Sequence, residues 1–250
     1  MEILYLDDSL VAVNKPAGLL VHRSNIDRHE TQFAMQKVRD QLGRRVYPLH
    51  RLDKPTAGVL VFALSAEVAR QMTPVMMNGV VKTYLAVVRG HCPESGLIDY
   101  PLVEQYDKMT DAKADKDKAP QQAVTAYQRL ATVELPHAVG RYPTARYSLL
   151  RIAPKTGRKH QIRRHMKHLF HPIVGDTTHG DGKHNQFFRE HFHCRRLLLA
   201  ATGMAFAHPV SGESLQLRAP LDVGFRRILA DLGWDNGVAG NVFPPPSTGV

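Results

Sequence analysis

The chain has few cysteines and no long hydrophobic run. Its 250 residues include two cysteines, Cys92 and Cys194, which lie far apart and support neither a disulfide framework nor a CxxC metal or redox pair. A reducing cytoplasm is therefore the simplest expectation. No apolar run reaches about 18 residues, and Met1 is not followed by a basic and then an apolar segment, so the sequence predicts neither a membrane span nor a signal peptide.

Motifs of several common enzyme classes are absent too. Without GxGxxG, Walker A or GxSxG, the sequence gives no support to a dinucleotide-binding protein, a P-loop NTPase or a serine hydrolase. Four histidines follow one another at His160, His165, His168 and His171, but HExxH, CxxC and a carboxylate at helical spacing are missing. We therefore expect no metal site, and we expect these histidines to form hydrogen bonds or to face a bound partner.

Positive charge is in excess. The chain has 33 Lys and Arg against 23 Asp and Glu, a formal net charge of +10. Such an excess favours a polyanionic partner, although a basic enzyme whose charge is unrelated to its substrate is the alternative.

Short β-like runs bounded by turn residues outnumber the helical segments. Strands are predicted at 3–6, 10–13, 18–21, 47–50, 59–64, 80–89, 124–133, 146–153, 195–207 and 214–218, and helices at 31–42, 66–78, 160–169, 185–191 and up to about 232. Because short turns join many of the strands, the pattern predicts an α+β fold with a mixed, mainly antiparallel central sheet and flanking helices.

Two segments are not expected to contribute to the core. Residues 107–122 are dense in charge and almost devoid of large apolar groups, which predicts a long solvated loop. Residues 235–250 contain a run of three prolines and are expected to be a disordered C-terminal tail. We therefore predict one domain over residues 1–234, interrupted by the charged loop.

The most informative stretch runs from His50 to Leu60, HRLDKPTAGVL, and places one acidic residue in a basic turn before an apolar strand. Asp53 lies between Arg51 and Lys54, and nearby cations keep a carboxylate ionised. An ionised aspartate can act as a nucleophile or as a base. The alternative interpretation is a surface turn with an ordinary ion pair.

Two further segments carry candidate side chains. In the predicted strand 80–89, Lys82 and Tyr84 share a face because side chains alternate along a strand. Residues 151–176 hold the densest basic cluster, within which Ile162, Met166 and Leu169 form a narrow apolar stripe on a helix. Arg163 lies at the margin of this stripe, where it can reach a buried carboxylate. Four other cations are better placed to meet phosphates: Lys155, Arg158, Lys159 and Arg164.

At this point the chain resembles a known family. Five segments together resemble the motifs of the RluA-type pseudouridine synthases, in the usual order: 13–18 (VNKPAG), 50–58 (HRLDKPTAG), 82–84 (KTY), 156–163 (TGRKHQIR) and 171–176 (HPIVGD). One departure is Ala57, where the family commonly has serine. The S4-like RNA-binding domain frequent in the family is not expected here, because the catalytic pattern begins at Ile3.

The resemblance implies a pseudouridine synthase catalytic fold, isomerisation of a uridine in RNA, and no cofactor. Asp53 would be the essential carboxylate, as nucleophile or as base, and Arg163 would pair with it. Tyr84 would stack on the base and take or relay the C5 proton, with a core tyrosine as the alternative. Arg51 would fill the stack left by the flipped nucleotide, assisted by His50. RNA would be bound by Lys82, Arg158, Lys159, His160 and Arg164.

Within the family, the compact form, the charged loop and the segment 140–144 (GRYPT) resemble members that modify the uridine at position 65 of tRNA. We therefore expect tRNA as the partner, a monomer, and no obligate protein partner or membrane. Ribosomal RNA or another tRNA position is the alternative substrate. A noncatalytic RNA-binding protein and a metal-dependent nuclease are the rival classes, and the presence of Asp53, Tyr84 and Arg163 argues against both.

Overall fold

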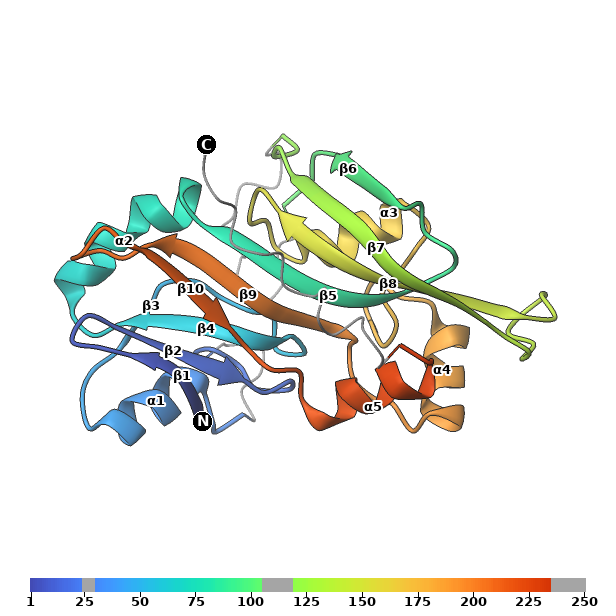
Figure 1. Ribbon diagram of the computed structural model, residues 1–250, viewed down its shortest axis with the longest axis horizontal. Helices are drawn as coiled ribbons and strands as arrows, with labels where there is room; N and C mark the ends of the chain where they lie inside the picture. Colours follow the sequence, from blue (N-terminus) through green and yellow to red (C-terminus); the bar gives the residue numbers. More distant parts are fainter. Residues whose placement is uncertain (24–29, 105–118, 235–250) are drawn as a thin grey trace.

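The computed structural model describes residues 1–23, 30–104 and 119–234 (Figure 1). The predicted loop at 107–122 lies mostly, and the predicted tail at 235–250 entirely, outside these ranges. The strands are β1 (Glu2–Leu6), β2 (Leu10–Lys15), β3 (Tyr47–Pro48), β4 (Ala57–Ala63), β5 (Val81–Arg89), β6 (Ser95–Asp99), β7 (Val124–Leu135), β8 (Ala145–Pro154), β9 (Leu199–Ala207) and β10 (Ser214–Arg218). The helices are α1 (Ala34–Leu42), α2 (Ala66–Asn78), α3 (Gln161–His168), α4 (Gly182–His191) and α5 (Val223–Asp231).

All ten strands belong to one sheet. Its order is β1-β2-β4-β9-β5-β8-β7-β6, with β3 also paired to β4 and β10 to β9. Neighbouring strands are antiparallel except β4 and β9, which run parallel at the centre. The prediction of an α+β fold with a mainly antiparallel sheet is thus confirmed.

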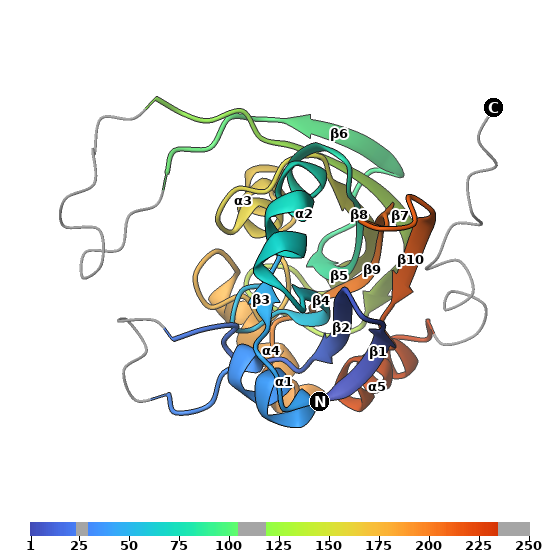
Figure 2. The same ribbon diagram turned by 90° about the vertical axis from the view of Figure 1, so that its left-hand side faces the viewer.

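Helices cover both faces of this sheet. On β5, Leu85 and Val87 pack in a cluster that includes residues of α4 and α5, whereas Ala86 and Val88 pack against Ile162 and Met166 of α3. Side chains of successive strand residues point to opposite faces, so α3 lies on one side of β5 and α5 on the other, as Figure 2 shows. The apolar stripe predicted for α3 is buried, but the buried face is wider than predicted, because Gln161, Arg163 and His165 are buried as well.

The central strand β4 is also buried on both faces. Leu60 and Phe62 pack with Ala34 and Val38 of α1, and Val59, Val61 and Ala63 pack with Met72 of α2. Ser65 caps α2, as its position before the helix predicts, and its hydroxyl accepts the Val68 N–H at 3.2 Å. The turn that carries Asp53 therefore leads directly into a strand that is buried along its whole length.

Three element predictions were wrong. Residues 18–21 form no strand but a single bridge from Leu20 to Phe33: the Leu19 carbonyl oxygen accepts from the Lys15 ammonium group, and those of Leu20 and Val21 accept from the first N–H groups of α1. Strand β3 covers only two of the four residues expected, and β9 begins at Leu199 rather than Arg195. Strand β6 was not predicted, since it is short and forms only by pairing with the distant β7.

Gly58 lets the two parallel strands approach closely. It pairs with Ala201, its φ is +117°, and an added Cβ would lie 2.0 Å from the Ala201 carbonyl oxygen. We expect Gly58→Ala to lower the free energy of unfolding by about 2–4 kcal/mol, through clash and backbone strain. Gly212→Ala is the matched control, since Gly212 also has a positive φ, +72°, but has nothing within 4 Å of an added Cβ. Urea denaturation measures both, and equal losses would contradict the clash.

None of the helices in the described part of the chain is long and apolar enough to cross a membrane.

Candidate active site

An open cavity of about 540 Å³ lies between the turn before β4, the start of β5 and the start of α3. Eight side chains selected from the sequence line it: His50, Arg51, Asp53, Lys82, Tyr84, Arg158, His160 and Arg163. The other three candidates, Lys155, Lys159 and Arg164, are not among its lining residues. Segments from distant parts of the sequence thus meet at one open cavity.

Asp53 is held by a cation from the other side of the cavity. Arg163 Nη1 donates to Asp53 Oδ2 at 3.0 Å, and Arg163 Nε and Nη2 donate to the two carboxylate oxygens of Asp176 at 2.7 and 2.8 Å. Arg163 and Asp176 are 4% and 2% exposed, whereas Asp53 faces the cavity. The guanidinium group therefore links a buried carboxylate to a reachable one.

Hydrogen bonds keep the Arg163 guanidinium group and the Asp176 carboxylate ionised despite their burial. Burial alone would lower the pKa of Arg163, but the bonds to Asp176 and Asp53 outweigh it and raise that pKa. Burial would raise the pKa of Asp176, but the bonds from Arg163 and from the His179 and Thr178 N–H groups lower it. Arg163 is thus a permanent cation beside Asp53.

The cations that flank Asp53 in the sequence take other places. Lys54 Nζ lies 3.0 Å from Glu30 Oε1, and Arg51 is exposed at the cavity. Among the contacts described for Asp53, the ion pair at hydrogen-bond distance comes from Arg163, 110 residues away.

His50 and Tyr84 are both neutral in this environment. Burial, aided by Lys82, lowers the pKa of His50 to about 3, and its Nε2 accepts the Val61 N–H at 3.2 Å. His50 is thereby fixed to β4, a structural contact that the sequence did not indicate. Burial and the neighbouring Asp53 charge raise the pKa of Tyr84, so its phenol keeps its proton. Lys82 and Tyr84 line the same cavity, as strand alternation predicts.

Lys15 supports the turn that carries Asp53, and sequence reasoning assigned it no role. Its side chain is 0% exposed, and Nζ donates to the carbonyl oxygens of Pro16, Leu19 and Lys54 at 3.0, 2.7 and 3.2 Å. Burial lowers the pKa of Lys15 to about 7, opposed by the charge of Asp53. A lysine at the end of an apolar strand, directly before a Pro-x-Gly turn, was the available signal.

Polar contacts hold the loop before α3. The Gln161 side chain accepts the Arg158 N–H at 3.0 Å and the Thr156 hydroxyl at 2.7 Å, and Arg158 Nε donates to the Gln122 carbonyl at 3.1 Å. Arg158 is thereby placed at the edge of the cavity, and exposed Lys159 follows it at the start of α3. Arg164 is half-buried, and burial lowers its pKa.

The four histidines of residues 160–171 have four separate sets of contacts. His160 lies between Asp53 and His179, His165 contacts Thr125 Oγ1 and the Tyr100 carbonyl, His168 stacks on Tyr100, and His171 contacts the Arg89 carbonyl. Within the described ranges, no group of three or more His, Cys, Asp or Glu side chains is arranged to hold a metal ion.

The chain matches known proteins over nearly its whole length. A family model described as RNA pseudouridylate synthase matches residues 9–168. The chain belongs to the RNA pseudouridylate synthase family. The tRNA pseudouridine synthase C of Vibrio cholerae is 56% identical over 239 residues, which cover 95% of this chain and 98% of that relative. That of Yersinia pestis is 53% identical over 240 residues, 96% and 93% of the two chains.

Solved structures agree with this family. Human RNA pseudouridylate synthase domain containing 4 superposes with a TM-score of 0.69 at 26% identity, over 93% of each chain. The related human domain containing 1 has a TM-score of 0.67 at 23% identity, over 88% of this chain and 83% of that one, and shares the fold. The protein is thus an RNA pseudouridine synthase, an isomerase that converts uridine to pseudouridine within RNA.

Proposed function

We propose that this synthase converts a uridine of tRNA to pseudouridine and that Asp53 is the carboxylate essential for the reaction. The observation that carries the proposal is the position of Asp53, which lies in an open cavity with Oδ2 bonded at 3.0 Å to the buried Arg163. tRNA is the preferred substrate because the relatives that match almost the entire chain carry the name tRNA pseudouridine synthase C.

The reaction requires a carboxylate and a space in which a base can turn. The N1–C1′ bond of the uridine breaks, the uracil rotates in the cavity, and C5 bonds to C1′; C5 then loses a proton and N1 gains one. Asp53 acts at the ribose, as nucleophile or as base, a role comparable to that of a carboxylate at an oxocarbenium-like centre in glycoside hydrolysis. Because the reaction is an isomerisation, it needs no external redox or group-transfer cofactor.

Tyr84 lines the cavity together with Lys82, and its side chain is suited to stack on the uracil and to relay a proton. Its ring offers a stacking surface, and its protonated phenol can pass on the C5 proton late in the reaction. Tyr84→Phe would keep the stacking surface and remove the proton relay.

The target nucleotide must leave its stack to reach Asp53, which costs a few kcal/mol. Arg51 is exposed at the cavity next to buried Leu52, so its planar guanidinium group is placed to stack where the base was. Arg158, Lys159 and Arg164, at and beyond the edge of the cavity, are placed to contact the phosphates around the extruded nucleotide.

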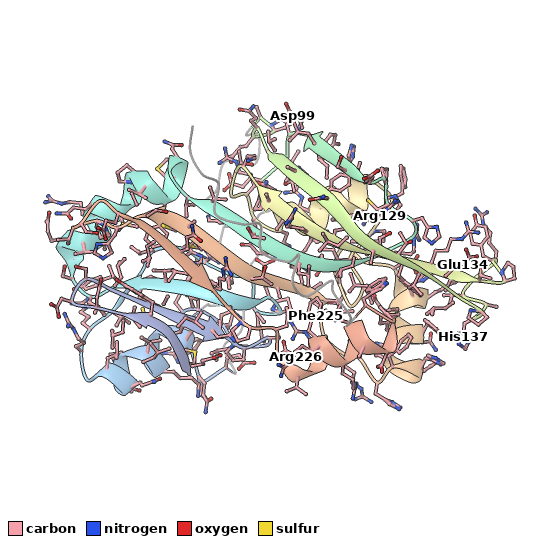
Figure 3. All side chains as sticks on the ribbon, viewed as in Figure 1. Asp99, Arg129, Glu134, His137, Phe225 and Arg226 are labelled. Carbon is pink, nitrogen blue, oxygen red and sulfur yellow. The ribbon has the colours of Figure 1, made fainter. Side chains whose placement is uncertain are left out.

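The phosphate contacts predict a salt dependence of tRNA binding. We expect log Kd to rise linearly with log salt concentration, and Lys159→Gln to reduce that slope by about 0.7–0.9, the contribution of one phosphate. The matched control is Arg226→Gln: Arg226 is exposed on α5, across the sheet from α3, and is labelled in Figure 3. Filter binding over a salt series measures the slopes, and an equal change in both variants would contradict the assignment of Lys159.

The proposal is tested by tritium release from C5-tritiated uridine in tRNA and ribosomal RNA transcripts. Release from tRNA is the expected result, and sequencing of the product then maps the modified uridine, which we expect at position 65. Release from ribosomal RNA alone would overturn the tRNA assignment and keep the chemistry. Binding of tRNA without release from either RNA would overturn the proposed activity and favour a noncatalytic RNA-binding protein.

We also infer a monomer that acts in the cytoplasm. Both cysteines are free and buried, and a tRNA-modifying enzyme meets its substrate in that compartment. Sedimentation at working concentration tests the monomer.

A further inference from the structure

His160 has an unusual backbone conformation at the edge of the cavity. It is the N-cap residue of α3, with φ 55° and ψ 24°, and it offers no side-chain cap to the helix. A left-handed conformation costs a residue other than glycine of order 1–3 kcal/mol, and such strain concentrates at functional sites. The conformation places the imidazole between Asp53 and a second histidine, His179.

The two histidines share one proton between facing ring nitrogens. His160 Nδ1 lies 3.0 Å from His179 Nε2, a hydrogen-bond distance, so one nitrogen donates and the other accepts. The other ring nitrogen of His160, Nε2, lies 3.8 Å from Asp53 Oδ2. If His160 donated from Nδ1, the Nε2 lone pair of the neutral ring would face the carboxylate and repel it. The favourable arrangement has His179 as donor and the His160 Nε2–H directed at Asp53.

Both rings keep their neutral form near pH 7. Burial lowers the pKa of His160, with Arg163 and Lys159 as nearby cations and Asp53 and Asp176 as opposing anions. Burial lowers the pKa of His179 to about 4, and here Asp176 opposes while Arg163, His160 and Lys167 assist. A neutral His160 ring carries a single N–H, so its tautomer decides whether Nε2 presents that hydrogen or a lone pair to Asp53.

Asp176 fixes both routes to the catalytic carboxylate. Its Oδ1 accepts the backbone N–H of His179 at 2.9 Å, and its two carboxylate oxygens accept from the Arg163 guanidinium group. His179 is only 7% exposed and does not line the cavity. It can therefore influence the reaction only through the side chains it holds.

We propose that His179 is a positioning residue that fixes the tautomer of His160, so that the His160 Nε2–H and Arg163 Nη1 both address Oδ2 of Asp53. With both donors on Oδ2, Oδ1 is the oxygen that Asp53 presents to the ribose. The contact of 3.8 Å shortens when the nucleotide closes the site, as hydrogen bonds that act in a reaction often do. This inference rests on the proposed role of Asp53.

The test compares His179→Met, which removes the donor and keeps an unbranched side chain, with His179→Gln, whose amide can donate from a similar place. His179→Met removes the donor that fixes the tautomer of His160, so the His160 Nε2–H is no longer held toward the charged Asp53. Loss of that hydrogen bond predicts a roughly tenfold fall in kcat on a tRNA transcript, with KM unchanged, and recovery of most of that loss in His179→Gln. Unchanged kcat in His179→Met, or an equal loss in both variants, would overturn the proposal, as would a change confined to KM.

A spectroscopic measurement gives a second, independent test. Two-bond proton–nitrogen correlations of the wild-type imidazoles at pH 7 distinguish the tautomers, and we expect the Nε2–H form for both His160 and His179. The Nδ1–H form of His160 would overturn the proposal even if activity falls. The Asp53→Asn variant distinguishes failure of the proposed function from failure of the positioning role. An active Asp53→Asn enzyme contradicts the proposed function. An inactive Asp53→Asn enzyme together with a normal His179→Met enzyme contradicts only the positioning role of His179.

Discussion

Asp53→Asn should abolish isomerisation, with turnover lower by at least about 10³-fold, while the enzyme still folds and binds tRNA. The amide has the shape of the carboxylate and can still accept the bond from Arg163 Nη1, so the change removes the charge and leaves the geometry. An amide is neither a nucleophile at the ribose nor a base. Tritium release measures turnover, and filter binding should give a Kd within about twofold of wild type or tighter, because a negative charge near phosphates is lost.

Asp99→Asn is the matched control for this variant. Asp99 is exposed at the end of β6, is labelled in Figure 3 and does not line the cavity, so the same chemical change should leave turnover unaltered. A turnover above about a tenth of the wild-type value in Asp53→Asn would show that the reaction does not depend on this carboxylate.

Arg163→Met should have the largest effect on stability. It removes the partner of Asp176, which is 2% exposed, and breaking a buried ion pair from one side costs about 3–5 kcal/mol. The substitution also removes the ion-pair partner of Asp53, so turnover should fall as well as the free energy of unfolding. Urea denaturation at pH 7 gives the first quantity, and tritium release under folding conditions gives the second.

The double variant Arg163→Met/Asp176→Asn separates loss of packing from an unpaired charge. The amide oxygen introduced at position 176 can still accept the backbone N–H groups of Thr178 and His179, and no unpaired anion remains buried there. We therefore expect the double variant to be more stable than Arg163→Met alone. Because the folded-state pKa of Asp176 is lowered, the wild-type pair stabilises the fold above the ordinary aspartate pKa of 3.8, and this contribution is lost as pH falls through the folded-state pKa. The gap between wild type and Arg163→Met should therefore shrink in acid. A double variant no better than the single one would show that packing dominates.

The sequence alone predicted those strands and helices whose apolar and polar side chains alternate with a regular period. The alternation in β5 predicts that Lys82 and Tyr84 face one way, and the stripe of Ile162 and Met166 predicts the buried face of α3, which leaves Arg163 at its margin, in reach of Asp53. These features depend on side-chain periodicity, which is a local property of the chain.

Contacts between distant segments were not predictable in the same way. Two sequence neighbours, Arg51 and Lys54, suggested the charge partners of Asp53, but Lys54 reaches Glu30 and the ion pair of Asp53 comes from α3. The contribution of Lys15 depends on three carbonyl groups, one of them 39 residues away. The bond of His179 to His160 likewise joins residues 19 apart across a turn. Sequence motifs indicated which residue types matter, whereas their partners depend on tertiary packing.

The parallel pairing of β4 with β9 has a consequence for synthesis of the protein. Residues 57–58 pair with residues 200–201, so the centre of the sheet cannot close until most of the chain has left the ribosome. Until then residues 57–58 of β4 lack a neighbour on the side of β9, although β2 and β3 already pair with β4, and unpaired strand edges invite association with other chains. Contacts this distant in sequence also form slowly. The turn that carries Asp53 is therefore completed late, and a nascent chain that stops before β9 should aggregate and be unable to modify RNA.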